Sequence, residues 1–385
     1  MIYLDNNATT RVDDEVVSSM TPYFRDIYGN PSSIHTLGLK AKTSVEAARE
    51  EVASVICSSA GEIMFTSGAT ESNNTVLKGI FFRGFLDGEK NQHFIISSIE
   101  HKCILETVKF IEKMGAEVTI LPVNNQGLVD IEDVRAAITS NTVLVSIMLA
   151  NNEIGSINPI REIAAICNKN DVLFHTDAAQ AFGKIHIDVG ELGVDFLSSS
   201  AHKHYGPKGV GILFVKSGLR DKLVPLMHGG NQEMNLRSGT INTPSIVGMA
   251  KSVSLFCSTS YVNAEMVKQG KLRDYLYAEI KKNIPSVILN GPPLDKKHLR
   301  LANNLNISFP GINKSVFNRK TSKIMFSTGS ACSSADLTAS YVLKNIGLED
   351  DLAQVSYRFG LSKYTTKQDI DEAVLIIKNA HRLAS

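Results

Sequence analysis

The amino-acid sequence predicts an α/β fold with a large mixed or parallel sheet and a smaller α+β domain towards the C-terminal end. Two observations support this prediction. Between residues 62 and 215, short runs rich in Val, Ile and Leu alternate with helical stretches of roughly ten residues. Beyond about Cys257 this alternation stops, and the sequence predicts a long polar helix followed by turn-rich segments. We expect a large domain over residues 15–256 and a small domain formed by residues 1–14 and 257–385.

The elements of the large domain follow from the positions of the apolar runs. Strands are expected over residues 62–67, 93–98, 117–123, 142–150, 172–177, 195–200 and 209–215. Helices are expected over residues 71–85, 102–114, 131–138 and 159–168. Because the strands read as nearly continuous apolar runs, we expect helices to cover both faces of their sheet.

The small domain is expected to begin with a polar helix over residues 264–283. A turn-rich segment, 285–293, leads into a strand over 304–309 that alternates as antiparallel strands do. A final helix covers about residues 367–381. The start of the chain is expected to return and contact this domain.

The composition is that of an ordinary globular protein, with 43% hydrophobic and 21% charged residues. The 40 basic and 39 acidic side chains leave a formal charge of +1, which argues against nucleic-acid and anionic-membrane binding. The first residues, MIYLDNNATT, lack the apolar segment of a signal peptide, and no apolar run is long enough to cross a bilayer. Five cysteines without metal-finger spacing favour free thiols, so we expect a cytoplasmic protein without a resident metal.

A glycine-containing turn, Ser67-Gly68-Ala69-Thr70-Glu71, joins a predicted strand to a predicted helix. Backbone amides at a helix start bind phosphate well, and the Thr70 hydroxyl adds a donor. Taken alone, such a turn is more often a simple helix cap.

A carboxylate, Asp177, ends another predicted strand in the run His175-Thr176-Asp177-Ala178-Ala179-Gln180. Ligands of doubly wound sheets bind at this edge. A carboxylate there can pair with the protonated ring nitrogen of pyridoxal phosphate (PLP), which strengthens the cofactor as an electron sink. An N-cap role for Asp177 is an equal alternative.

A lysine, Lys203, follows a third predicted strand and precedes a glycine-proline turn. Schiff-base chemistry needs a neutral amine, which burial and cationic neighbours favour, and His202 and His204 flank this lysine. A lone lysine in a loop is usually a solvated charge, but a serine and a histidine just before it, Ser200 and His202, supply phosphate donors beside the amine.

These segments belong to a longer ordered set. It comprises LDNNATT at 4–10, YGNPSS at 28–33 with His35, TSGATESNN at 66–74, EH at 100–101, NNEIG at 151–155, DAAQ at 177–180, AHK-x-YGPKG at 201–209, RSGT at 237–240 and GSAC at 329–332. Together they resemble the class I (NifS/IscS-type) cysteine desulfurases, which are fold-type I PLP enzymes of the class V aminotransferase superfamily. The resemblance extends from about residue 2 to residue 370.

The resemblance implies a role for each residue that matches a family motif. Lys203 would bind PLP as a Schiff base, Asp177 would hold the pyridine nitrogen, and His101 would stack on the ring and relay protons. Gln180 and Asn152 would form hydrogen bonds with the phenolic oxygen of the cofactor.

The phosphate and the substrate have their own implied partners. The phosphate would be held by the Ala69 amide and by Thr70, Ser200 and His202, and Thr240 would reach the phosphate in the partner subunit of a homodimer. Arg358 would bind the carboxylate of L-cysteine, beside Asn152. A guanidinium fork suits that task because it pairs bidentately.

The resemblance also implies the reaction. L-Cysteine would become L-alanine, and Cys332 would accept the sulfur as a persulfide and pass it to an iron–sulfur scaffold or a thiolation relay. A transient contact of Cys332 with an iron–sulfur cluster would be the one metal contact expected. Cys57, Cys167 and Cys257 read as inert buried residues, and Cys103, although close to His101 in sequence, is also interpreted as structural.

Two positions depart from the family pattern. Residues 312–320 are basic where the family has an acidic, leucine-rich helix, and Ala339 stands where a proline is common. Both departures concern how the loop with Cys332 is presented and how a partner protein docks.

Three alternative functions stay open. An aminotransferase or selenocysteine lyase would keep the fold, but the GSAC segment favours a desulfurase. His175-x-Asp177 with a later histidine also imitates an iron oxygenase site, although the lysine context argues against it. A non-catalytic sulfur-transfer protein would not need Lys203.

Overall fold

A seven-stranded sheet forms the larger part of the protein in the computed structural model, which describes residues 1–328 and 339–385. Its strands are β2 (Ile63–Thr66), β3 (His93–Ser97), β4 (Glu117–Leu121), β5 (Thr142–Ser146), β6 (Leu173–Asp177), β7 (Phe196–Ser200) and β8 (Gly211–Val215). They lie in the order β2-β8-β7-β6-β5-β3-β4, and only β8 runs antiparallel to its neighbours. This mixed, mostly parallel sheet confirms the predicted fold class.

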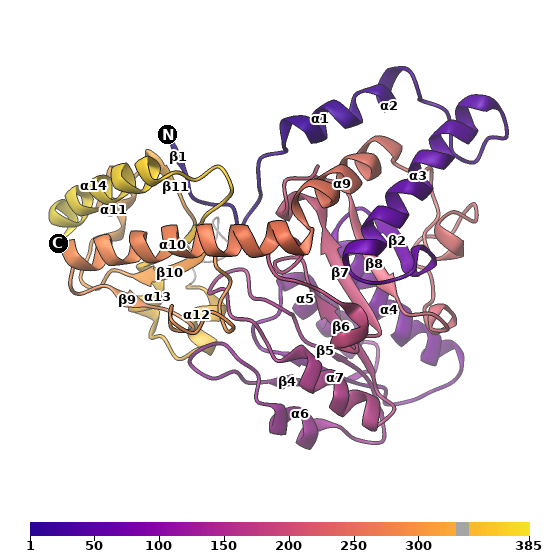
Figure 1. The fold of residues 1–385 in the computed structure, drawn as a ribbon. Helices are drawn as coiled ribbons and strands as arrows, with labels where there is room; N and C mark the ends of the chain where they lie inside the picture. Colours follow the sequence, from indigo (N-terminus) through magenta and orange to yellow (C-terminus); the bar gives the residue numbers. More distant parts are fainter. Residues whose placement is uncertain (329–338) are drawn as a thin grey trace.

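Helices cover both faces of this sheet (Figure 1). They are α3 (Thr36–Val55), α4 (Ala69–Leu86), α5 (Lys102–Glu112), α6 (Ile131–Ala137), α7 (Ile160–Lys169), α8 (Val189–Leu192) and α9 (Thr243–Phe256). The short helices α1 (Asp14–Met20) and α2 (Pro22–Arg25) pack on α9. Residues of α3, α7 and α9 share one hydrophobic core with the sheet, and residues of α4 and α5 share another. Met64 and Phe65 enter different cores because successive strand side chains point to opposite faces.

Two long helices, α3 and α9, were not predicted. The signal for α3 was available, since Ala41, Val45, Ala48 and Val52 recur at helical spacing and are all buried. For α9 the signal was weak, because small and apolar residues are buried on most of its surface and periodicity then does not separate helix from strand. The predicted starts of two other helices were late: α4 begins at Ala69 and the long polar helix at Thr259.

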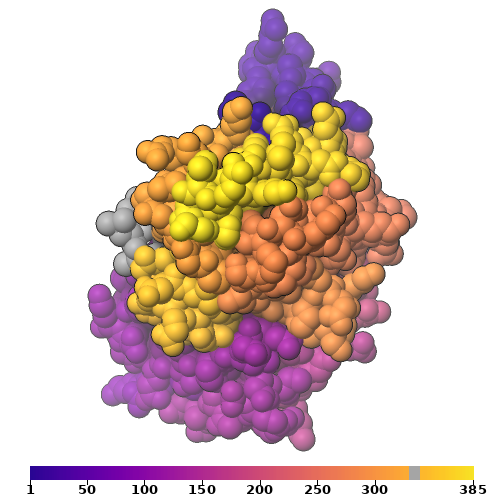
Figure 2. All heavy atoms as spheres, turned by 90° about the vertical axis from the view of Figure 1, so that its left-hand side faces the viewer, coloured from indigo at the N-terminus to yellow at the C-terminus, as the bar shows by residue number. Residues whose placement is uncertain are grey.

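A second, smaller sheet lies beside the large one (Figure 1). Its central strand β10 (Asn304–Ser308) pairs antiparallel with β12 (Ser356–Gly360) and β9 (Ile288–Leu289). A separate two-stranded sheet is formed by β1 (Ile2–Tyr3), which pairs parallel with β11 (Ile324–Met325). The helices here are α10 (Thr259–Asn283), α11 (Lys314–Lys320), α12 (Tyr341–Asn345), α13 (Asp350–Gln354) and α14 (Lys367–Ala384). Figure 2 shows α10 and α14 side by side over one face of this region, and α11 lies within the basic segment 312–320.

The antiparallel strand predicted over residues 304–309 is confirmed as β10, but both of its faces are buried. Leu305 and Ile307 enter the core of the small sheet. On the other face, the side-chain amides of Asn304 and Asn306 each donate a hydrogen bond to the Glu153 carbonyl at 3.1 Å. The polar face of the strand is therefore buried against the loop that follows β5, where hydrogen bonds compensate its desolvation.

The start of the chain contacts the small sheet. Ile2 and Leu4 are buried in the same core as Leu276 and Ile280 of α10. The division of the chain into two domains at residues 14 and 256 stays a prediction. Among the described residues, no helix is both long enough and apolar enough to cross a membrane.

Candidate active site

A cavity of about 440 Å³ opens at the carboxyl ends of the parallel strands, between the large and the small sheet. Its walls combine the starts of α4 and α5, the loops after β5, β6 and β7, the first residues of the chain and β12. The sequence-predicted residues that line it are Ala69, Thr70, His101, Asn152, Asp177, Gln180, Ser200, His202, Lys203 and Arg358. These predicted residues come from six separate segments of the chain and converge on one space.

The turn before α4 forms one end of this cavity. Gly68 has a φ of 150°, a conformation that L side chains rarely adopt, and this bend turns the strand into the helix. Gly211 of β8 lies close behind, since a Cβ there would come within 2.7 Å of the Gly68 Cα. The first amides of α4 have no acceptor within the helix, so the turn presents donors and a positive dipole to the cavity.

Asp177 lies at the end of β6 and is 5% exposed. One carboxylate oxygen accepts a hydrogen bond from the Ala179 amide at 2.9 Å, and the other accepts one from Asn73 Nδ2 at 2.7 Å. Both oxygens are therefore oriented by the protein. Asn73 of α4 was not predicted to act here, although it stands inside the TSGATESNN segment.

His101 is the N-cap of α5, and its ring borders the cavity. Its Nδ1 accepts a hydrogen bond from the Cys103 amide at 3.2 Å, so the neutral ring carries its proton on Nε2. Burial lowers the pKa of His101, which favours this neutral form. The Cys103 thiol lies 3.1 Å from the same Nδ1, and burial raises its pKa to about 12.

Lys203 ends a 3₁₀ turn, Ala201–Lys203, directly after β7. Its Nζ donates hydrogen bonds to the carbonyls of Asn7 and Ala8, at 2.8 and 2.7 Å. The neighbouring His202 ring lies 3.1 Å from the Thr9 hydroxyl, and burial lowers the pKa of His202 to about 3. The LDNNATT segment at the start of the chain is thus part of the lysine site, a role that was not predicted.

Arg358 is at the centre of β12 and is 1% exposed. It faces the cavity because its register partner is Asn306, on the polar face of β10. Its guanidinium donates to Asp5 Oδ1 at 2.8 Å and to the Asn152 carbonyl at 3.1 Å, while Nε has no partner among the described residues. Asp5 was not predicted as a partner, because local periodicity carries no signal for a contact between positions 5 and 358.

Two predicted residues are not in this cavity. Thr240 is exposed and does not line it. In the same segment, Arg237 forms an ion pair with Glu71 of α4 at 2.9 Å. Cys332 lies outside the described residues. Among residues 1–328 and 339–385, no group of three potential metal ligands was found.

The interpretation of Cys57 as a buried residue was wrong, because the structure places it at the exposed end of α3. Cys57 has a φ of 57°, a left-handed backbone conformation of the kind that ends helices, so the chain turns away from α3 at this residue. Cys167 and Cys257 are buried, as predicted. Cys103 is half-buried and borders the cavity.

Fold and sequence place the chain among known proteins. The family model for class-V aminotransferases matches residues 2–373. The cysteine desulfurase IscS of Dictyoglomus turgidum is 45% identical over 98% of this chain and 93% of its own length. The mitosomal cysteine desulfurase of Encephalitozoon cuniculi is 46% identical over 96% and 84%.

Solved structures agree with these relatives. A NifS-like protein superposes with a TM-score of 0.89 at 37% identity, covering 98% of both chains. SspA in complex with cysteine superposes with a TM-score of 0.83 at 38% identity, covering 95% of this chain and all of the other. The protein therefore belongs to the cysteine desulfurases within the aminotransferase class-V family, and the resemblance seen in the sequence is confirmed.

Proposed function

We propose that this protein binds PLP at Lys203, converts L-cysteine to L-alanine and transfers the sulfur to Cys332 as a persulfide. The observation that carries the proposal is the convergence of Lys203, Asp177, His101 and Arg358 on one cavity at the sheet edge. The names of the relatives support the reaction, and the structure of SspA in complex with cysteine supports the substrate.

The cavity suits PLP in its donor set and in its size. The start of α4, with the Thr70 and Ser200 hydroxyls beside it, suits a phosphate. Asp177, held by Asn73 and by its own turn, suits a protonated pyridine nitrogen. The volume of about 440 Å³ is within the range of roughly 300–1,000 Å³ typical of small-molecule sites.

When bound, PLP would supply an electron sink for the negative charge that develops at the substrate Cα. Lys203 would exchange its hydrogen bonds with the Asn7 and Ala8 carbonyls for the cofactor, and its amine would move the proton at Cα. His101, neutral and protonated on Nε2, would donate a proton from that atom. Arg358 would orient the substrate through its carboxylate.

The sulfur step would fall to Cys332. Its thiolate would form a bond to the substrate sulfur while the bond between that sulfur and Cβ breaks, which leaves the sulfur on Cys332 and the carbon skeleton as alanine. The persulfide would then pass to an acceptor, such as an iron–sulfur scaffold protein. We also propose a homodimer, in which Thr240, exposed in this chain, reaches the phosphate of the partner's site.

This function can be tested directly by absorbance and product measurements on the purified protein. We expect a visible absorbance band from bound PLP that changes when L-cysteine is added, and formation of alanine and sulfide in equal amounts with a thiol reductant present. A product keto acid instead of alanine would indicate an aminotransferase. A protein that binds iron and shows no band after incubation with PLP would contradict the proposal.

Arg358→Lys is expected to raise the KM for L-cysteine by about 10- to 100-fold, the cost of losing a charge-assisted bidentate contact of roughly 1.5–3 kcal/mol. A lysine keeps the charge but not the planar fork. The absorbance band of bound PLP should stay unchanged, which separates substrate binding from cofactor binding. Arg135→Lys, an exposed arginine on α6, serves as the matched control. A KM like that of the wild type would exclude Arg358 as the carboxylate partner.

A further inference from the structure

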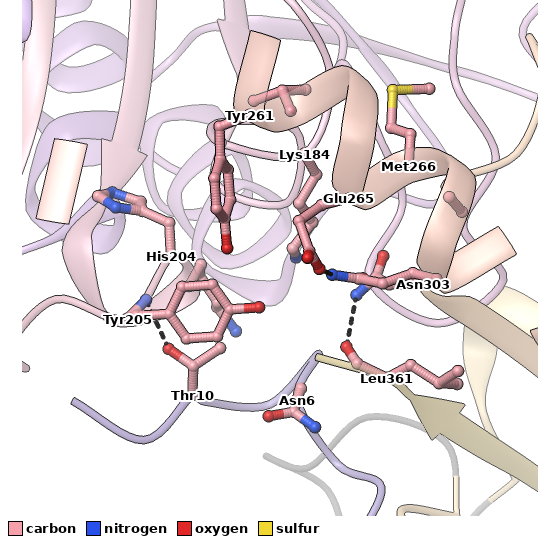
Figure 3. A pocket seen from close by; sticks show the side chains of 15 residues that line it. Asn6, Thr10, Lys184, His204, Tyr205, Tyr261, Glu265, Met266, Asn303 and Leu361 are labelled. Carbon is pink, nitrogen blue, oxygen red and sulfur yellow. Dashed lines mark hydrogen bonds between the residues drawn. The ribbon is translucent and has the colours of Figure 1, made fainter. Parts of the chain in front are cut away.

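A second lysine, Lys184, lines a small cavity of about 20 Å³ that Lys203 also borders. Figure 3 shows Lys184 close to Tyr261 and Glu265. This cavity also contains Tyr261 and Glu265 of α10. The Lys184 ammonium donates a hydrogen bond to Gln180 Oε1 at 2.9 Å. Within the described part of the chain, it forms no ion pair with a carboxylate. Glu265 is engaged elsewhere, by Lys268 at 3.3 Å and by Gln269 at 2.7 Å.

Lys184 is half-buried, and a partly desolvated ammonium without a counter-ion is unfavourable, because burial removes part of its hydration and nothing replaces the lost charge interaction. Methionine would fill a similar volume at lower cost. A strongly perturbed charged group beside a cleft is a candidate for a functional role. Lys184 fits that description, since Gln180, which accepts its hydrogen bond, also lines the large cavity.

The hydrogen bonds connect Lys184 to Lys203 through a single side chain. Gln180 accepts from Lys184 through Oε1, and its Nε2 donates to the Asn7 carbonyl at 2.8 Å. The same carbonyl accepts from Lys203 Nζ at 2.8 Å. Because a lysine ammonium can only donate, it orients the Gln180 amide, and the second Nε2 hydrogen is left as a donor on the cavity side.

Charge provides a second connection. The pKa of Lys184 is lowered to about 7 by burial first, then by the charges of Lys203 and Arg358. Repulsion between two ammonium groups is mutual, so a charged Lys184 also disfavours the charged form of Lys203. The titratable groups that line the small cavity with these two amines are His204, Tyr205, Tyr261 and Glu265. The large cavity adds Glu71, His101, Cys103, Asp177, His202, Lys208 and Arg358 around Lys203. The pKa of His202 and of His204 is lowered to about 3, and that of Tyr205 and of Tyr261 is raised, so these four side chains are neutral near pH 7.

We propose that Lys184 is a positioning residue for the cofactor site: it fixes Gln180 as a hydrogen-bond donor towards PLP and favours the neutral amine of Lys203. This inference rests on the proposed function, because it assigns Lys184 a task only if PLP binds at Lys203. It predicts a pH-dependent effect on cofactor capture, which a purely structural lysine would not produce.

The test is the rate at which the cofactor-free protein captures PLP, followed by absorbance at pH 6 and at pH 8.5. In Lys184→Met, capture at pH 6 should be about tenfold slower than in the wild type. Removing a neighbouring positive charge raises the pKa of an ammonium group by about 1 unit, so a smaller fraction of Lys203 carries the neutral amine that reacts with PLP. At pH 8.5 the two rates should converge, because Lys184 itself loses its proton near pH 7. Lys184→Arg, which keeps the charge and the donor, should restore the rate at pH 6. Lys109→Met, an exposed lysine on α5, should behave as the wild type at both pH values.

A second measurement isolates the contribution of Gln180. Lys184→Met should raise the Kd for PLP, whereas in a Gln180→Leu background the same substitution should change the Kd much less, because both act through one side chain. Thermal unfolding checks the fold, and Lys184→Gln replaces Lys184→Met if the latter does not fold. If Lys184→Met follows the wild-type rate at both pH values, or if the two substitutions are additive, the positioning role is wrong. If the wild type itself captures no PLP while folded, the proposed function fails instead.

Discussion

Lys203→Ala is expected to lower the kcat of alanine formation by about 10⁴-fold, the upper end of the effect of losing a group that moves the substrate proton. It should also abolish the covalent PLP adduct that borohydride traps in the wild type. The fold should persist, because the Lys203 side chain lines a cavity, where its amine donates hydrogen bonds to two backbone carbonyls, those of Asn7 and Ala8. Borohydride reduction followed by peptide mass spectrometry locates the adduct.

Lys208 is the control for this result, because it also lines the cavity and lies five positions further along the same loop. Lys208→Ala should retain the adduct on Lys203. An adduct on Lys208 in the wild type would contradict the assignment of Lys203, and with it the roles proposed for Asp177, His101 and Gln180.

Cys332→Ser is expected to bind PLP and L-cysteine normally yet release no sulfide, because an alcohol cannot accept the sulfur as a persulfide. An unperturbed thiol has a pKa of about 8.5, so only a minor fraction is thiolate near neutral pH unless cations of the site favour it. Gly329, Ser330 and Ala331 have small side chains, which suits the close approach of Cys332 to the substrate sulfur that this step requires. Persulfide labelling with mass spectrometry after cysteine treatment identifies the acceptor.

The described thiols supply the internal controls. Cys103 lies beside His101, but a thiol whose pKa is raised to about 12 stays protonated near pH 7, so no persulfide is expected there. Cys57 is exposed, and Cys57→Ser should leave sulfide release unchanged. A persulfide on Cys103 rather than on Cys332 would overturn the sulfur step and leave the assignment of Lys203 intact.

The periodicity of the sequence determined which segments form the large sheet and the ends of β6, β7 and β8. The strand expected to reach residue 150 ends at Ser146 as β5. The strands expected at residues 172–177 and 195–200 are β6 and β7, and Asp177 and Lys203 follow from them as residues at the sheet edge. This works because an apolar run bounded by polar residues reports local burial. The same signal failed for α9, whose surface is apolar on most sides, and for β12, which is short and carries Arg358 at its centre.

The partners that hold the site were decided by the tertiary structure. Asp5 orients Arg358, Asn73 orients Asp177, and the Asn7 carbonyl connects Lys203 with Gln180. Each contact joins segments that are far apart in the chain, and strand or helix periodicity contains no information on such pairs. Periodicity indicates which face of a helix or strand is buried, but only the folded chain shows which residues that face contacts.

The sequence alone therefore determined the family, the sheet edge that carries the chemistry and the identity of the reacting lysine as a candidate. The tertiary structure decided the electrostatics of the site. The charge state of Lys184 and the tautomer of His101 both depend on burial and on hydrogen-bond partners from other elements. Burial and hydrogen bonding act through space, and their effect on a side chain exists only once the distant segments have come together.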